Sequence, residues 1–146
     1  MKPFVFRLES VLRYRTFKEK KALAALVAAR QGHADIEKKI GSLFYQRQKS
    51  AGLRSSRGRE GVVAGTYQAY TSFLQKLDRD LLAEKEALDR AAQLVRARES
   101  ELVVETRKRK TLESLRETQL ERHRADIEKK TQQMLDELII NRWETV

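Results

Sequence analysis

The chain's strongest constraint on its fold is a pair of apolar repeats at helical spacing, one on each side of a glycine-rich stretch. In the first repeat, from about residue 6 to 50, the recurring positions follow steps of four and three, the spacing of an a/d seam in a coiled coil. These positions are Leu8, Leu12, Arg15, Glu19, Ala22, Leu26, Ala29, His33, Ile36, Ile40 and Leu43.

A second repeat occupies residues 66 to about 142, a stretch that contains neither proline nor any glycine after its start. One edge is regular and recurs every seven residues, whereas the companion edge mixes apolar and charged side chains. After Leu112 the register slips, which locally alters a supercoil, and a seven-residue step then resumes at Leu120, Ile127 and Met134. The regular edge comprises Leu74, Leu81, Leu88, Val95 and Leu102.

Composition alone leaves two structural classes open. Charged residues make up 36% of the 146 residues and aromatic residues 7%, which suits long solvated helices but also a disordered chain. The periodicity favours helices. Arg15 and Glu19 interrupt the first seam, so we expect packing there to be weaker or ion-paired.

Between the repeats, residues 51–65 contain four glycines among serines and arginines, and no apolar stripe continues. Helix propensity falls at glycine, so the sequence predicts a loop in which the chain reverses, with Thr66 as the N-cap of the following helix. We therefore expect a single all-α domain over residues 1–146, a long antiparallel two-helix coiled coil or helical hairpin. Helix 1 spans about 6–50, the loop about 51–65, and the longer helix 2 about 66–142.

A reversal near residue 56 fixes which residues can pair, because the numbers of two partners then add to about 112. Ile36 would lie near Leu77, and Ile40 near Leu74. The start of helix 1 would reach only to about residue 108, leaving roughly the last 30 residues without an internal partner. An apolar stripe without an internal partner predicts an external one.

Other features argue against catalysis and against a membrane-spanning protein. There is no cysteine, no apolar run of about 20 residues and no signal-peptide pattern at the N-terminus. We expect His33 in the seam and His123 on a solvated face, with no carboxylate cluster near either. The sequence has no phosphate-binding glycine motif. We expect no enzyme activity, cofactor or metal.

The net charge of +10 favours acidic partners. Its densest run, Arg107, Lys108, Arg109 and Lys110, is either a solvated helical face or a docking site for an acidic protein surface. Nucleic acid is disfavoured because aromatic residues do not interleave with these charges. A second feature is an aromatic group near the loop, some of which we expect in the core and some as exposed anchors: Phe44, Tyr45, Tyr67, Tyr70 and Phe73.

Four segments stand out by their order and spacing along nearly the whole chain. The first is the opening Phe4-x-Phe6-x-Leu8 with Leu12, Arg15 and Glu19. The others are Tyr67-Gln68-x-Tyr70-x-x-Phe73-Leu74-x-x-Leu77, Lys108-Arg109-Lys110-x-Leu112-Glu113-x-Leu115 and Leu135-Asp136-Glu137. In order, spacing and length these segments resemble the FliJ family, and the first is similar to the start of that family.

The resemblance implies a component of the flagellar type III export apparatus, cytoplasmic and peripherally associated with its inner-membrane part. It implies a coiled coil similar to the γ stalk of rotary ATPases, which inserts in the hexameric ring of the export ATPase FliI. It also implies contacts with export chaperones and with the cytoplasmic domain of the gate protein FlhA. On this reading Tyr70, Phe73 and Leu77 bind the gate protein. The ring-binding tip is Phe4, Phe6, Leu8, Leu135, Leu138, Ile139 and Trp143.

Three alternatives remain open from the sequence. They are the equivalent stalk of a virulence type III secretion system, a basic coiled coil that binds nucleic acid, and a hairpin chaperone that captures unfolded chains at its unpartnered end. The Arg-rich stretch from Arg54 to Arg59 matches no motif of the family.

Overall fold

The computed structural model describes residues 2–146 and contains two helices, α1 (Glu9–Glu60) and α2 (Ala64–Glu144). No strand occurs among these residues. The chain divides into two compact units: a turn unit, Ala22–Leu102, and a terminal unit, Met1–Lys21 with Val103–Val146. Within each unit a stretch of α1 packs antiparallel against a stretch of α2. The predicted all-α hairpin with a longer second helix is confirmed, whereas the single domain stays a prediction.

The turn unit has a thin leucine core, as expected for two helices that share one seam. Ion pairs flank this core and show the antiparallel direction, because the partner numbers on α2 fall as those on α1 rise. Arg30 lies 3.2 Å from Glu99, Lys39 lies 2.6 Å from Glu84, and Arg47 pairs with Asp78. The buried residues are Leu26, Ala29, Leu74, Leu77 and Leu81.

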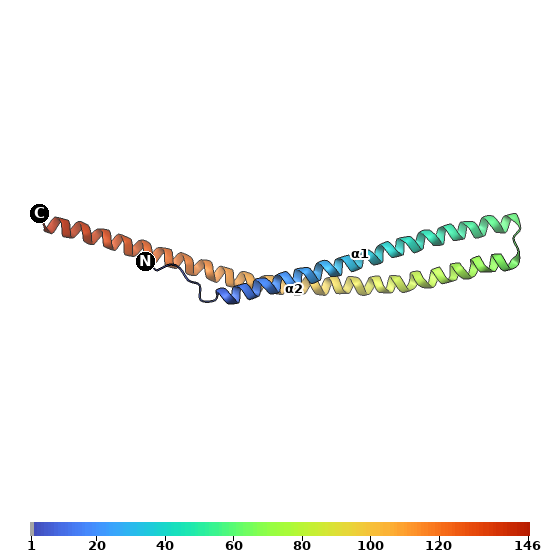
Figure 1. Cartoon of the computed structure of the whole chain (residues 1–146), viewed down its shortest axis with the longest axis horizontal. Helices are drawn as coiled ribbons and strands as arrows, with labels where there is room; N and C mark the ends of the chain where they lie inside the picture. Colours follow the sequence, from blue (N-terminus) through green and yellow to red (C-terminus); the bar gives the residue numbers. More distant parts are fainter. Residues whose placement is uncertain (1) are drawn as a thin grey trace. The chain divides into compact units, whose positions relative to one another are not determined.

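The connection between the helices is much shorter than predicted. The loop over residues 51–65 is wrong in extent, since α1 continues to Glu60 and only residues 61–63 separate it from α2. Gly61 has a φ of 81°, a left-handed conformation that favours glycine. Figure 1 shows this short connection between the ends of α1 and α2 in the turn unit.

Tyr67 of α2 packs beside the glycine- and serine-rich end of α1. The guanidinium carbon of Arg54 lies 5.8 Å from the centre of the Tyr67 ring. A Cβ at Gly58 would stand 3.2 Å from a carbon of that ring, so glycine allows the ring to approach the helix backbone. The predicted N-cap at Thr66 is also wrong: the amides of Thr66 and Tyr67 already donate to the carbonyl of Val63, at 2.9 and 3.2 Å.

Moving the reversal from residue 56 to residue 62 shifts the register between the helices. The numbers of the ion-paired residues in the turn unit add to 125 for Arg47 and Asp78, and to 123 for Lys39 and Glu84, rather than to about 112. The predicted proximity of Ile36 to Leu77 is therefore wrong. Ile36 instead lines a shallow hollow with Ala91 and Leu94.

In the terminal unit, α1 begins at Glu9, and residues 2–8 continue without helix alongside α2 (Figure 1). Phe6 and Leu12 are its buried residues, with 5% and 9% of their surfaces exposed. Leu8, predicted in the seam, is 38% exposed, so that assignment is wrong. The helical seam starts at Leu12, and Phe6 takes the preceding core position from the extended segment.

Replacing glycine by alanine should change the free energy of unfolding in opposite directions at Gly61 and at Gly52. Gly61→Ala should lower the free energy of unfolding by about 1–2 kcal/mol, because a Cβ disfavours its left-handed conformation. Gly52→Ala should raise it by roughly 0.5–1 kcal/mol, because Gly52 is helical and its Cβ would meet no atom within 4 Å. Urea denaturation followed by circular dichroism measures both. A destabilised Gly52→Ala variant would instead support the longer loop.

Candidate protein-binding surfaces

The last part of α2 carries large apolar side chains that nothing in the described chain covers. Every residue from Glu128 to Val146 is exposed. Trp143 exposes 78% of its surface and Leu138 exposes 64%. In Figure 1 the final turns of α2 have no second segment beside them within the terminal unit. Monomeric proteins seldom expose such clusters without a binding role. The exposed apolar residues are Met134, Leu135, Leu138, Ile139, Ile140, Trp143 and Val146.

Helical spacing gathers most of these side chains on one face. At about 100° per residue, Leu135, Leu138, Ile139 and Trp143 fall within a stripe roughly 140° wide, and Val146 follows just beyond the end of α2. Ile139, Trp143 and Val146 line one hollow together with Arg142. Ile140 lies about 140° from Leu135 and therefore off this face. We call these five residues the apolar stripe; their arrangement suits the groove of a partner protein.

The C-terminal part of α2 that lacks a partner segment is shorter than predicted. The N-terminal residues pack along α2 well past residue 108: Glu9 lies 3.3 Å from Arg116, and the Phe4 ring lies 5.6 Å from the His123 ring. Ile127 is still half-buried. The prediction that the last 30 or so residues lack a partner is therefore wrong, and the exposed part begins at Glu128.

The predicted ring-binding tip divides into two groups with different environments. Phe6 is buried within the terminal unit, and Phe4 is half-buried between His123 and the guanidinium of Arg116, which lies 5.9 Å from the ring centre. The apolar stripe begins twelve residues beyond His123, about 18 Å along the helix. The structure therefore does not join Phe4 and Phe6 to the stripe as one surface.

His123 is half-buried, so its predicted place on a solvated face is wrong. It contacts Phe4, a side chain at the other end of the sequence, which helical periodicity within α2 could not show. The spacing of Phe4 and Phe6 was the available signal, because alternate residues of an extended segment point to the same side and can pack together on one neighbouring helix. His33 is half-buried, with Nδ1 3.5 Å from Glu37.

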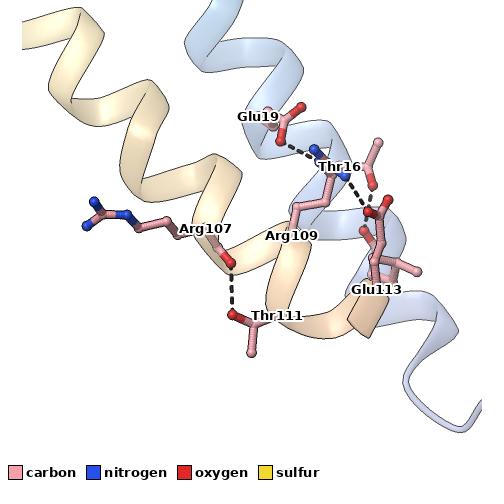
Figure 2. A network of polar contacts seen from close by, with 7 residues as sticks. Thr16, Glu19, Arg107, Arg109, Thr111 and Glu113 are labelled. Carbon is pink, nitrogen blue, oxygen red and sulfur yellow. Dashed lines mark hydrogen bonds and ion pairs between the residues drawn. The ribbon is translucent and has the colours of Figure 1, made fainter. Parts of the chain in front are cut away.

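The basic run separates into one structural residue and three exposed residues. Arg109 is half-buried, and its guanidinium donates to Glu19 of α1 and to Glu113 of α2, each at 2.5 Å. Figure 2 shows this network, with the Arg107 side chain pointing away from α1. Arg107, Lys108 and Lys110 are exposed, and of these three only Lys108 has an ion-pair partner in the part of the chain that the structure describes, Glu105 at 4.0 Å.

The two carboxylates around Arg109 favour its charged form. The hydrogen bond to Glu19 is the main cause that raises the pKa of Arg109, followed by the hydrogen bond to Glu113. This contact confirms that the polar position at Glu19 in the seam is ion-paired. Because removing one partner of a half-buried pair strands the other charge, Arg109 holds the helices together rather than being free to dock a partner.

The three residues predicted to bind the gate protein also differ in exposure. Leu77 is a core residue with 3% of its surface exposed, Tyr70 is half-buried, and Phe73 is 43% exposed. On α1, Phe44 and Tyr45 are exposed by 52% and 65%. Phe73 is therefore the one predicted gate-binding side chain with much surface to offer, while Leu77 packs α2 against α1.

Among residues 2–146, no three His, Cys, Asp or Glu side chains come close enough together to hold a metal ion. Neither helix has, in the same residues, a stretch that is long and apolar enough to cross a membrane.

Comparison with known proteins gives one match. The family model described as flagellar FliJ protein matches residues 4–145, which is nearly the whole chain. Neither the curated proteins nor the solved structures include a match.

The Arg109 network predicts unequal roles for two neighbouring basic residues. Arg109→Gln should lower the urea midpoint, because Glu19 would lose its partner at a half-buried position. Lys110→Gln is the matched control: it removes the same charge from an exposed residue and should leave the midpoint nearly unchanged. Equal shifts for the two variants would contradict a structural role for Arg109.

Proposed function

Since the chain belongs to the FliJ family, whose members take part in flagellar type III export, we propose that it is a stalk that binds the ring of the export ATPase. Binding promotes assembly and activity of the FliI hexamer. The flagellar description of the matching family favours this role over the equivalent stalk of a virulence secretion system.

The apolar stripe at the end of α2 is the observation that carries the proposal. From Glu128 onward every side chain is exposed, and the stripe presents Leu135, Leu138, Ile139 and Trp143 on one helical face. Tryptophan is enriched among the residues that dominate binding energy, and burial of the large aliphatic side chains adds a hydrophobic contribution. A helix end that projects beyond its own partner segment has the form needed to enter a ring.

Residues 2–8 stabilise the part of α2 from which the apolar stripe projects. Phe6 is buried and Phe4 packs on His123, so both fasten residues 2–8 to α2 and stiffen the base from which the exposed segment projects. Leu8, 38% exposed, is the member of this group with surface for direct contact. A rigid base lowers the conformational entropy lost on binding.

Coupling to the rest of the export apparatus belongs to the same proposal. Phe73, with Tyr70 beside it on α2, contacts the cytoplasmic domain of the gate protein FlhA, while Leu77 keeps that part of α2 on α1. The exposed Arg107, Lys108 and Lys110 suit an acidic protein surface, and export chaperones are further partners. The protein acts in the cytoplasm at the inner-membrane export apparatus. It activates the ATPase by binding the active ring state more tightly than the inactive one.

A truncation after Lys130 tests the ring-binding role. It removes the apolar stripe but keeps His123, which contacts Phe4, and Ile127, which is half-buried. Helical content and the urea midpoint should stay close to those of the full chain, while stimulation of FliI ATPase activity is lost. Stimulation that survives this cut would refute the assignment.

A paired substitution tests whether one face makes the contact. Ile139 and Ile140 are adjacent and expose 55% and 56% of their surfaces, but only Ile139 belongs to the apolar stripe. Ile139→Asp should weaken binding to the ATPase at least tenfold, the loss typical of an interface anchor. Ile140→Asp should have a smaller effect in the same titration. Equal losses would argue against a one-sided contact.

A further inference from the structure

The turn between the helices carries many more basic than acidic side chains. Between Arg47 and Asp78, which pair with each other, the chain has five Lys or Arg residues and one acidic residue, Glu60. The basic ones are Lys49, Arg54, Arg57, Arg59 and Lys76. Within the described residues, none of these five takes part in an ion pair. Elsewhere in the turn unit, basic residues alternate with acidic ones. Arg30, Lys39 and Arg98 have acidic partners. Lys38, Arg79, Lys85 and Arg90 have no ion pair among the described residues, but each directly follows an acidic residue in the sequence.

Helix stability explains part of this charge but not all of it. Arg57 and Arg59 lie in the last turn of α1, where cations favour the negative end of the helix dipole. Arg54 lies outside that last turn, with its guanidinium over the Tyr67 ring. The first turn of α2, the positive end of its dipole, has no acidic residue to offset it. The field at the turn is therefore more positive than capping requires.

The three arginines surround the end of α1 rather than lining one side of it. At about 100° per residue, Arg57 lies about 60° from Arg54 on the helix, whereas Arg59 lies about 140° away in the other direction. All three are within about 10 Å of the turn along the helix axis. A partner lying along the hairpin, such as a duplex or another helix, would reach only some of them. A broad anionic surface that meets the turn end-on reaches all three.

The apex is apolar. Val63, in the connection, exposes 77% of its surface, and Val62 precedes it. Tyr67 follows on the first turns of α2, 45% exposed. An apolar apex, a ring of arginines and a tyrosine behind them match the layers of a bilayer interface, where aromatic rings lie at the headgroup level and long cations reach phosphates.

We propose that the turn, residues 54–67, is a docking tip for an anionic phospholipid surface. Val63 enters the interface, and Arg54, Arg57 and Arg59 contact lipid phosphates around it. This contact is separate from the ATPase-binding role, because that role uses the terminal unit.

Sedimentation of the full chain with vesicles tests the proposal. The wild-type chain should bind vesicles of phosphatidylcholine with 30% phosphatidylglycerol, and pure phosphatidylcholine vesicles far less. The triple variant Arg54→Gln/Arg57→Gln/Arg59→Gln should bind the anionic vesicles at least tenfold more weakly, since each basic residue near such a surface contributes about fivefold. Glutamine keeps the helix propensity of arginine nearly unchanged, and circular dichroism checks the fold.

A charge-matched control comes from the other exposed basic run. Arg107→Gln/Lys108→Gln/Lys110→Gln removes the same number of charges from exposed positions on α2 and should reduce vesicle binding by no more than two- to threefold. If both triple variants lose binding equally, the attraction is a property of net charge and the proposal fails.

Insertion of the apex has its own readout. In a Val63→Trp/Trp143→Phe variant, the single tryptophan should show a blue-shifted emission with anionic vesicles and no shift with phosphatidylcholine. An unshifted emission would overturn the proposal. So would tip-dependent binding of polyglutamate or a short duplex DNA without vesicle binding, because the tip would then serve an acidic protein or a nucleic acid. None of these outcomes bears on the ATPase-binding role.

Discussion

The position of the chain reversal decides which residues of α1 can meet which residues of α2, and most other features depend on this constraint. Gly61 adopts a left-handed conformation that other residues seldom take, and it places the turn at residues 61–63. Glu19 can then reach Arg109, and Glu9 can reach Arg116. The same register determines how much of α2 remains without a partner after the N-terminal residues have packed.

Charge is used differently in different parts of the chain. Arg109 is held by two carboxylates, and Lys39 by one, whose hydrogen bond raises the pKa of that lysine. Such pairs guide the helices into register and keep a thin core from having to specify the pairing alone. Near the turn, Arg54, Arg57 and Arg59 have no such partners within residues 2–146. The net charge of +10 is therefore a poor guide to binding, because basic side chains that already pair with a carboxylate attract an acidic partner less than unpaired ones do.

The sequence predicted the helical hairpin, the longer second helix and a seam near Glu19 that is either weaker or ion-paired, because long periodic segments report directly on which side chains share a face. The turn was misplaced, because Gly52 and Gly58 lower helix propensity, yet the helix continues through both and Gly58 lies beside the Tyr67 ring, a contact that propensity does not include. The partner of His123 and the burial of Phe6 depend on an extended segment, so helical periodicity could not reveal them. The sequence also predicted an apolar C-terminal segment without an internal partner. Its starting residue was wrong, because that residue was calculated from the misplaced turn.

The three-residue connection also has a consequence for the order in which the hairpin forms. Arg47 and Asp78 are separated by 31 residues in sequence, whereas Glu9 and Arg116 are separated by 107. Because the entropy lost in closing a loop grows with its length, pairing is expected to start near the turn and advance as a zipper, with residues 2–8 docking last. The segment that docks last is also the first to fray. Thermal opening is therefore expected to begin at Phe4 and Phe6, in the same unit that carries the apolar stripe.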